Sequence, residues 1–125
     1  MKKVLFSLLV LSMVLTLGLL QSSRATADEK KLSISAVMKQ AHLPKRKSLK
    51  DRVVAGKADD AEKKKLLELY EALAKCTPDK GTKESWKKRT GALVSAAKDV
   101  VAGKEGARGA LGRAASCGSC HRAHK

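Results

Sequence analysis

Apolar residues recur at intervals of three and four along most of the chain, starting near residue 34. Within 34–41 they fall on one face of a helix, a spacing typical of an amphipathic α-helix. Ser33 stands in the position of an N-cap, and Pro44 is expected to end or kink the helix. The pattern therefore predicts one helix that stops shortly before residue 44.

The remaining pattern predicts further helices separated by short turns. A short piece is expected at 48–56, longer helices at 59–74 and 82–103, and a last helix from about 105 through 121. The two longest helices would turn inward the apolar residues Leu66, Leu69, Tyr70, Leu73 and Ala74 in one, and Trp86, Thr90, Leu93, Val94, Ala97, Val100 and Val101 in the other. No strand pattern is visible. We therefore expect an all-α fold, an antiparallel four-helix bundle with four main helices.

Large apolar side chains are scarce in the last predicted helix. Its apolar face is nearly all alanine and glycine, including Gly106, Gly109, Gly112 and Gly118, although glycine inside a helix costs about 1 kcal/mol against alanine. The whole chain has only one Phe, one Trp and one Tyr. We interpret both deficits as room for a large planar apolar cofactor that approaches the backbone closely.

Residues 1–27 have the pattern of a cleaved secretory signal peptide. Lys2 and Lys3 precede a long uncharged apolar run, and 25–27 read Ala-Thr-Ala, a small-residue cleavage site. The alternative is a retained membrane anchor. We expect cleavage, export to the periplasm, and a soluble helical domain of residues 28–125 without stable membrane insertion.

The chain is strongly basic, with 27 Lys and Arg against 12 Asp and Glu. The formal charge of +15 falls to +12 when residues 1–27 are removed. Export and the shortage of aromatic side chains argue against nucleic acid as a partner. The basic runs at 45–47, 63–65 and 87–89 are either solvated surfaces or docking surfaces for acidic partners.

A Cys-x-x-Cys-His motif lies near the C-terminus, at Cys117, Cys120 and His121. This motif is the signature of covalent c-type haem attachment. On a helical turn the two thiols face the same side and can form thioethers with the two vinyl groups of one porphyrin. His121 then becomes the proximal iron ligand. We therefore expect haem c on the C-terminal helix.

Three other sites could use these residues, and each fits the sequence less well. A thioredoxin-like redox pair needs a βαβ pattern, which the sequence lacks. A zinc site using Cys117, Cys120, His121 and His124 would crowd four ligands into eight residues of one helix. A disulfide between Cys117 and Cys120 would strain the helix.

The sixth iron ligand is open to three interpretations. His124 follows His121 on the same face, so we expect it to contact solvent or a propionate near the chain end. Met38 is the favoured ligand, His42 the alternative, and an open site the third possibility. Outside iron ligation, Met38 would be core filler and His42 a surface histidine at a helix C-terminus.

A helical bundle with this motif on its last helix resembles cytochrome c prime and its low-spin relatives. Residues 117–121 match the family motif in full, and Lys125 matches its basic position, whereas His124 stands where the family commonly has an aromatic residue. The resemblance covers 32–125 as architecture. It implies covalent haem and, as in the low-spin relatives, a methionine ligand from the first helix, here Met38.

Two functions follow as expectations. The first is a periplasmic one-electron carrier that meets acidic redox partner proteins and that, as in this family, can form a homodimer. The alternative is a five-coordinate haem protein that binds small gases. No acid–base pair, nucleophile constellation or phosphate loop indicates an enzyme. Cys76, the remaining thiol, is expected to be a partly buried apolar residue.

Overall fold

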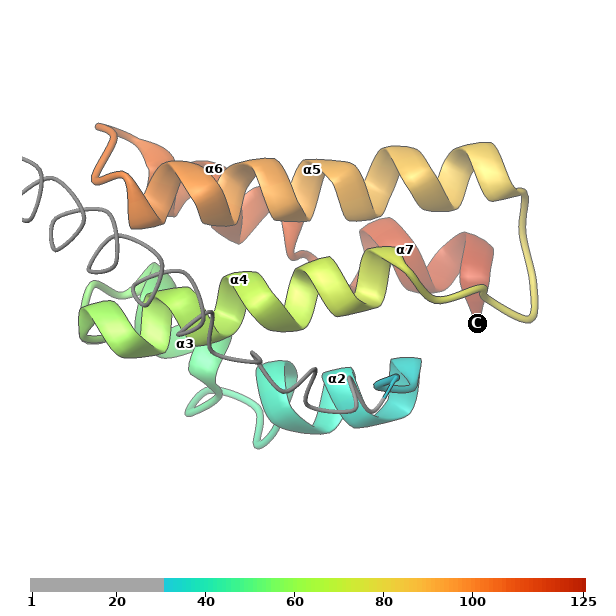
Figure 1. Ribbon diagram of the computed structural model, residues 1–125, viewed down its shortest axis with the longest axis horizontal. Helices are drawn as coiled ribbons and strands as arrows, with labels where there is room; N and C mark the ends of the chain where they lie inside the picture. The colour runs from blue at the N-terminus through green and yellow to red at the C-terminus, as the bar shows by residue number, and fades with distance from the viewer. Residues whose placement is uncertain (1–30) are drawn as a thin grey trace, which may run out of the picture. The chain divides into compact units, whose positions relative to one another are not determined.

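The computed structural model describes residues 31–125, and the predicted signal peptide at 1–27 lies outside the described residues. Six helices follow one another in this part of the chain (Figure 1). They are α2 (Ile34–His42), α3 (Leu49–Val54), α4 (Asp60–Ala74), α5 (Lys83–Val101), α6 (Ala107–Ala114) and α7 (Cys117–His124). No strand is present in residues 31–125, so the expected all-helical class is confirmed there.

The centre of the fold is the antiparallel pair α4 and α5, joined by the turn that contains Gly81. Helices α2 and α3 pack on α4, while α6 and α7 pack on α5. Figure 1 shows α4 and α5 side by side, with α2 along the outer side of α4. This arrangement is compatible with a helical bundle.

Local sequence signals define where four of these helices begin. The side chains of Ser33, Ser48, Asp59 and Thr82 each accept a hydrogen bond from a backbone N–H of the first turn. Those before α3 and α4 are complete capping boxes. All four starts, and the end of α2 before Pro44, agree with the sequence-based prediction.

The core is built from the apolar faces of α2 to α6. Its largest fully buried apolar side chains are those of Tyr70, Leu66, Leu69, Leu73, Leu111, Val37 and Val53. Trp86 is also buried. Most residues of the stripes predicted for the two long helices therefore lie in the interior, as the helical period requires. Ala74, however, is exposed, and Val94 and Val101 are only partly buried.

The last helix was wrongly predicted as one continuous element. The chain leaves the helix after Ala114 and re-enters it at Cys117, with Ser116 in extended conformation between them. The Ser119 hydroxyl donates to the Ser116 carbonyl over 2.6 Å, and such local serine bonds compete with helix continuation. The motif therefore lies on a separate short helix, α7.

The interpretation of the small-residue face was also wrong. Gly106 precedes α6 with a positive φ of 71°, a conformation that favours glycine. A Cβ at Gly112 would lie 3.4 Å from Val54 of α3, an ordinary van der Waals distance. Neither Gly109 nor Gly112 lines the cavity described next.

Candidate cofactor site

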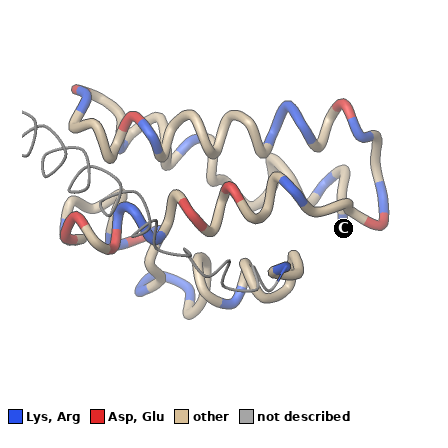
Figure 2. Tube along the Cα trace, viewed as in Figure 1, with Lys and Arg blue, Asp and Glu red and all other residues tan. Residues whose placement is uncertain are grey.

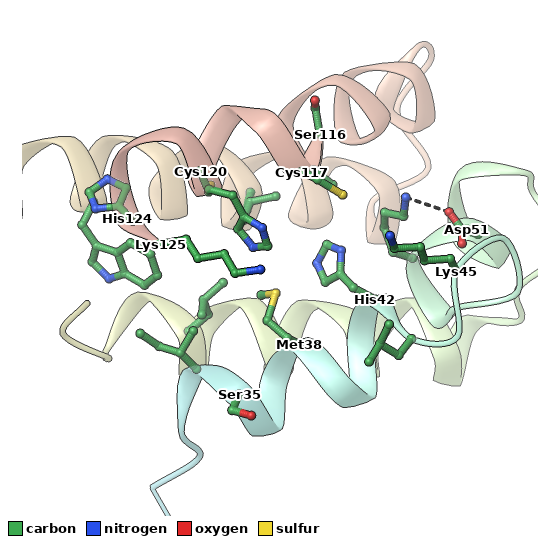
Figure 3. Close-up of a pocket in the computed structure, with 18 of the residues that line it drawn as sticks. Ser35, Met38, His42, Lys45, Asp51, Ser116, Cys117, Cys120, His124 and Lys125 are labelled. Atoms are coloured by element: carbon green, nitrogen blue, oxygen red, sulfur yellow. Dashed lines mark ion pairs between the residues drawn. The ribbon is translucent and has the colours of Figure 1, made fainter. Parts of the chain in front are cut away.

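A cavity of about 830 Å³ lies between α2 and α7 (Figure 3). Its volume is in the range of pockets that hold drug-sized ligands and cofactors, about 300–1,000 Å³. Its apolar wall includes Ile34, Leu43, Leu73, Leu93 and Ala115. Side chains from five helices, α2, α3, α4, α5 and α7, line the cavity.

One wall of the cavity carries the Cys-x-x-Cys-His motif. Cys117, Cys120 and His121 all line the cavity, because α7 places residues three and four apart on one face. Both thiols are free, with Cys117 exposed and Cys120 half-buried. The motif residues therefore converge on one space, as the helical spacing predicted.

The opposite wall is formed by α2. Met38 and His42 lie one turn apart and both line the cavity, and Figure 3 shows both side chains on the side of α2 that faces α7. Met38 is partly buried and packs against the core. Each of the two candidate ligands therefore faces the space that the motif lines.

His42 is held by a residue that sequence reasoning had assigned only to the core. Its Nε2 shares a hydrogen bond of 3.3 Å with the hydroxyl of Tyr70, which is fully buried. Burial, followed by the charge of Lys50, lowers the pKa of His42 to about 4, while burial raises the pKa of Tyr70. His42 is thus a neutral, half-buried imidazole, and its interpretation as a surface histidine is wrong. The signal was available, because a tyrosine inside an apolar stripe needs a partner for its hydroxyl.

His124 has partners within the protein that the sequence did not predict. Its Nδ1 donates to the carbonyl oxygen of Lys80 over 2.8 Å, and its Nε2 lies 3.1 Å from the hydroxyl of Ser85. The ring meets Trp86 edge-on, with 5.2 Å between centroids. Both ring nitrogens are thus hydrogen-bonded within the protein, although the side chain is only half-buried, and the expected propionate contact stays a prediction.

Charged side chains surround the polar part of the cavity. Lys45, Arg46, Lys50 and Lys125 contribute cations, and Asp51 and Asp79 contribute carboxylates. Lys50 lies 2.7 Å from Asp51, and hydrogen bonding from Lys50 is the main reason that the pKa of Asp51 falls to about 2. The loop between α2 and α3 contains no acidic residue, and Figure 2 shows it as a basic segment.

Cys76 lies away from the cavity. It is half-buried against the core, and its thiol donates to the carbonyl oxygen of Leu32 over 3.1 Å. The prediction of a partly buried small residue is confirmed.

Comparisons with known proteins give no relatives: no protein-family model, curated protein or solved structure matches this chain. Among the described helices, none has both the length and the apolar character needed to cross a membrane.

Proposed function

We propose that this protein is an exported c-type cytochrome of the helical-bundle class that carries one covalent haem and transfers one electron at a time. The observation that carries the proposal is the convergence of Cys117, Cys120 and His121 on one cavity wall, facing Met38 and His42. Two thiolates and an imidazole in this spacing suit thioether attachment and proximal ligation of an iron porphyrin.

The cavity chemistry supports a porphyrin over the competing interpretations. Its lining is mainly apolar, as a macrocycle requires. The zinc alternative loses its fourth donor, because both nitrogens of His124 are bound to Lys80 and Ser85. The disulfide alternative is disfavoured, because both thiols are free and one helix holds them.

Met38 is the preferred sixth ligand. Its thioether has no hydrogen bond to give up on approaching a metal. His42 can keep its bond to Tyr70 at Nε2 only if it binds the metal through Nδ1, and this bond restricts the orientation of the ring. The restriction favours Met38, with His42 remaining as the polar neighbour one turn away.

The bound haem would supply reversible one-electron chemistry, and the chain supplies its environment. Cys117 and Cys120 would fix the macrocycle against α7, and His121 would bind the iron on that side. Leu73 and Leu93 are buried apolar residues of the cavity lining, and apolar contact with the macrocycle would limit solvent reorganisation when the charge changes. With both His121 and Met38 as iron ligands, the site would hold no free position for a substrate at the metal.

The proposed setting is the periplasm, with acidic redox proteins as partners. Lys45 and Arg46 line the cavity and are exposed to solvent. Beside them, Leu43 is 49% exposed and is the one large exposed hydrophobic residue in the described part of the chain. An apolar contact surrounded by positive charge suits a short-lived complex with an acidic surface.

The direct test is covalent haem content. The full chain is co-expressed with cytochrome c maturation machinery, exported and analysed by intact mass, haem staining and the Soret band. We expect the mass of one haem above the processed polypeptide. Cys117→Ser and Cys120→Ser should each lose one thioether, and the double variant should lose covalent haem altogether.

Cys76→Ser is the matched control, because Cys76 is the third free thiol and lies outside the cavity. It should retain full haem. Matured wild-type protein with the bare polypeptide mass and no Soret absorption would overturn the proposal.

A further inference from the structure

The short helix α7 buries little of its surface against the rest of the protein. None of its residues is buried, whereas each of the other described helices has at least one buried side chain. Its position therefore depends less on core packing than that of the other helices and more on specific contacts at its ends.

The two ends of α7 are attached in different ways. At the start, the Ser119 hydroxyl donates to the carbonyls of Ser116 and Ala114, at 2.6 and 3.3 Å, and these bonds are local in sequence. At the other end, His124 reaches Lys80 and Ser85, about forty residues away in sequence. His124 thus provides the long-range attachment.

Trp86 and Gly81 lie directly beside the imidazole of His124. The ring meets Trp86 edge-on, and Trp86 is itself buried. Gly81 lies directly against the imidazole, so that a Cβ at this position would collide with the ring. The Lys80 carbonyl can only accept, so Nδ1 of His124 carries the proton that it donates. Nε2 shares a hydrogen bond with the Ser85 hydroxyl.

We infer that His124 is a positioning residue that fixes the rotation of α7, and through it the direction in which His121 enters the cavity. The two histidines are three residues apart and share one side of the helix. Contacts that orient a ligand side chain tune the metal that it binds. The effect of His124 on the iron rests on the proposed haem function. The attachment of α7 by His124 does not.

Three variants test separately whether His124 attaches α7 and whether this attachment affects the iron. His124→Phe keeps a ring against Trp86 and removes both hydrogen bonds. His124→Asn keeps a donor at about the place of Nδ1 and should restore the bond to Lys80. Arg122→Ala is the control on the same helix, because the Arg122 side chain donates only to the Gly118 carbonyl within α7.

The first readout is amide hydrogen exchange of the full exported protein, which does not depend on haem chemistry. In His124→Phe, the amides of α7 should exchange about ten- to a hundredfold faster, as expected for two lost hydrogen bonds, while α4 and α5 keep their protection. His124→Asn should recover most of the loss, and Arg122→Ala should match wild type. Unchanged α7 exchange, or faster exchange in all helices together, would overturn the inference.

The second readout is the state of the iron. His124→Phe should shift the reduction potential of the haem. The electron paramagnetic resonance spectrum of the ferric variant should show several signals in place of one. His124→Asn should return both the potential and the spectrum toward those of wild type. Selective loosening of α7 with an unchanged potential and resonance would reduce His124 to a purely structural contact and overturn the positioning role. Protein without haem but with selective α7 loosening would reject the proposed function while supporting the attachment.

Discussion

The hydroxyl of Tyr70 and Nε2 of His42 lie 3.3 Å apart and share a hydrogen bond between α4 and α2. Their rings are tilted at 45° with centroids 5.8 Å apart. Burial keeps the imidazole neutral and the phenol protonated at neutral pH. The bond therefore engages Nε2 of His42 and restrains its ring, whereas the thioether of Met38 has no such partner.

The identity of the sixth ligand is the first prediction. Met38→Ala should convert the matured ferrous protein from a low-spin to a high-spin spectrum, because the thioether is lost and the bond to Tyr70 restrains the His42 ring where it is. His42→Ala should stay low-spin. Absorption and magnetic circular dichroism spectra of both reduced variants provide the measurement.

Two outcomes would contradict this assignment. A low-spin Met38→Ala protein together with a high-spin His42→Ala protein would make His42 the ligand. Wild-type protein that is high-spin and binds carbon monoxide readily would support the gas-binding alternative. In that case, neither substitution should alter the spin state.

The capping box of α3 gives a second prediction. Asp51 accepts from the backbone N–H and hydroxyl of Ser48, at 3.3 and 2.8 Å, while its N–H donates to the Ser48 hydroxyl. Asp51→Asn should weaken this cap and lower the free energy of unfolding by about 0.5–2 kcal/mol, the usual range for helix caps. Urea unfolding at neutral pH measures the loss.

The same substitution should also change the pH dependence. The folded-state pKa of Asp51 is lowered to about 2, so its charged form stabilises the fold above the ordinary pKa of 3.8, and this contribution disappears as pH falls toward 2. The stability difference between wild type and Asp51→Asn should therefore shrink over that interval. Asp79→Asn, at an exposed carboxylate that caps no helix, is the control and should show no comparable narrowing. A difference that is constant with pH would contradict the assignment.

The sequence predicted the local features of this fold well and the tertiary contacts poorly. Helix starts at Ser33 and Asp59 depend on side chains within one turn, which a sequence pattern displays directly. The break at Ser116 was hidden because the small apolar residues keep helical spacing across it. The partners of His42 and His124 lie 28 and 44 residues away, and no local pattern encodes such pairs. The motif residues were found because their chemistry depends only on spacing along one helix.

Gly81 provides a third prediction, with an internal control. Gly81 and Gly103 both have positive φ, 85° and 70°, but only Gly81 faces His124, while the space at Gly103 is open. Gly103→Ala should cost only the left-handed strain of alanine, about 1–2 kcal/mol. Gly81→Ala should cost more and displace the imidazole, which urea unfolding and histidine NMR shifts would detect. Equal losses, with His124 shifts unchanged, would contradict a close fit between Gly81 and His124.

Charge beside the cavity gives the last prediction. The loop cations Lys45, Arg46 and Lys47 are exposed, and reversing all three to Glu should slow electron transfer from the ferrous protein to ferricyanide, an anionic probe, by about tenfold at low salt. The difference should largely vanish near 0.15 M salt, where the screening length is about 8 Å. Stopped-flow rates at several ionic strengths provide the measurement.

The matched control reverses the exposed residues Lys64, Lys87 and Lys88, which do not line the cavity. It makes the same change in net charge but should slow the reaction much less, because the field at the site of electron exit depends on nearby charges. Equal slowing in both triple variants would mean that only the total charge matters, and the loop would then have no special role in meeting an acidic partner.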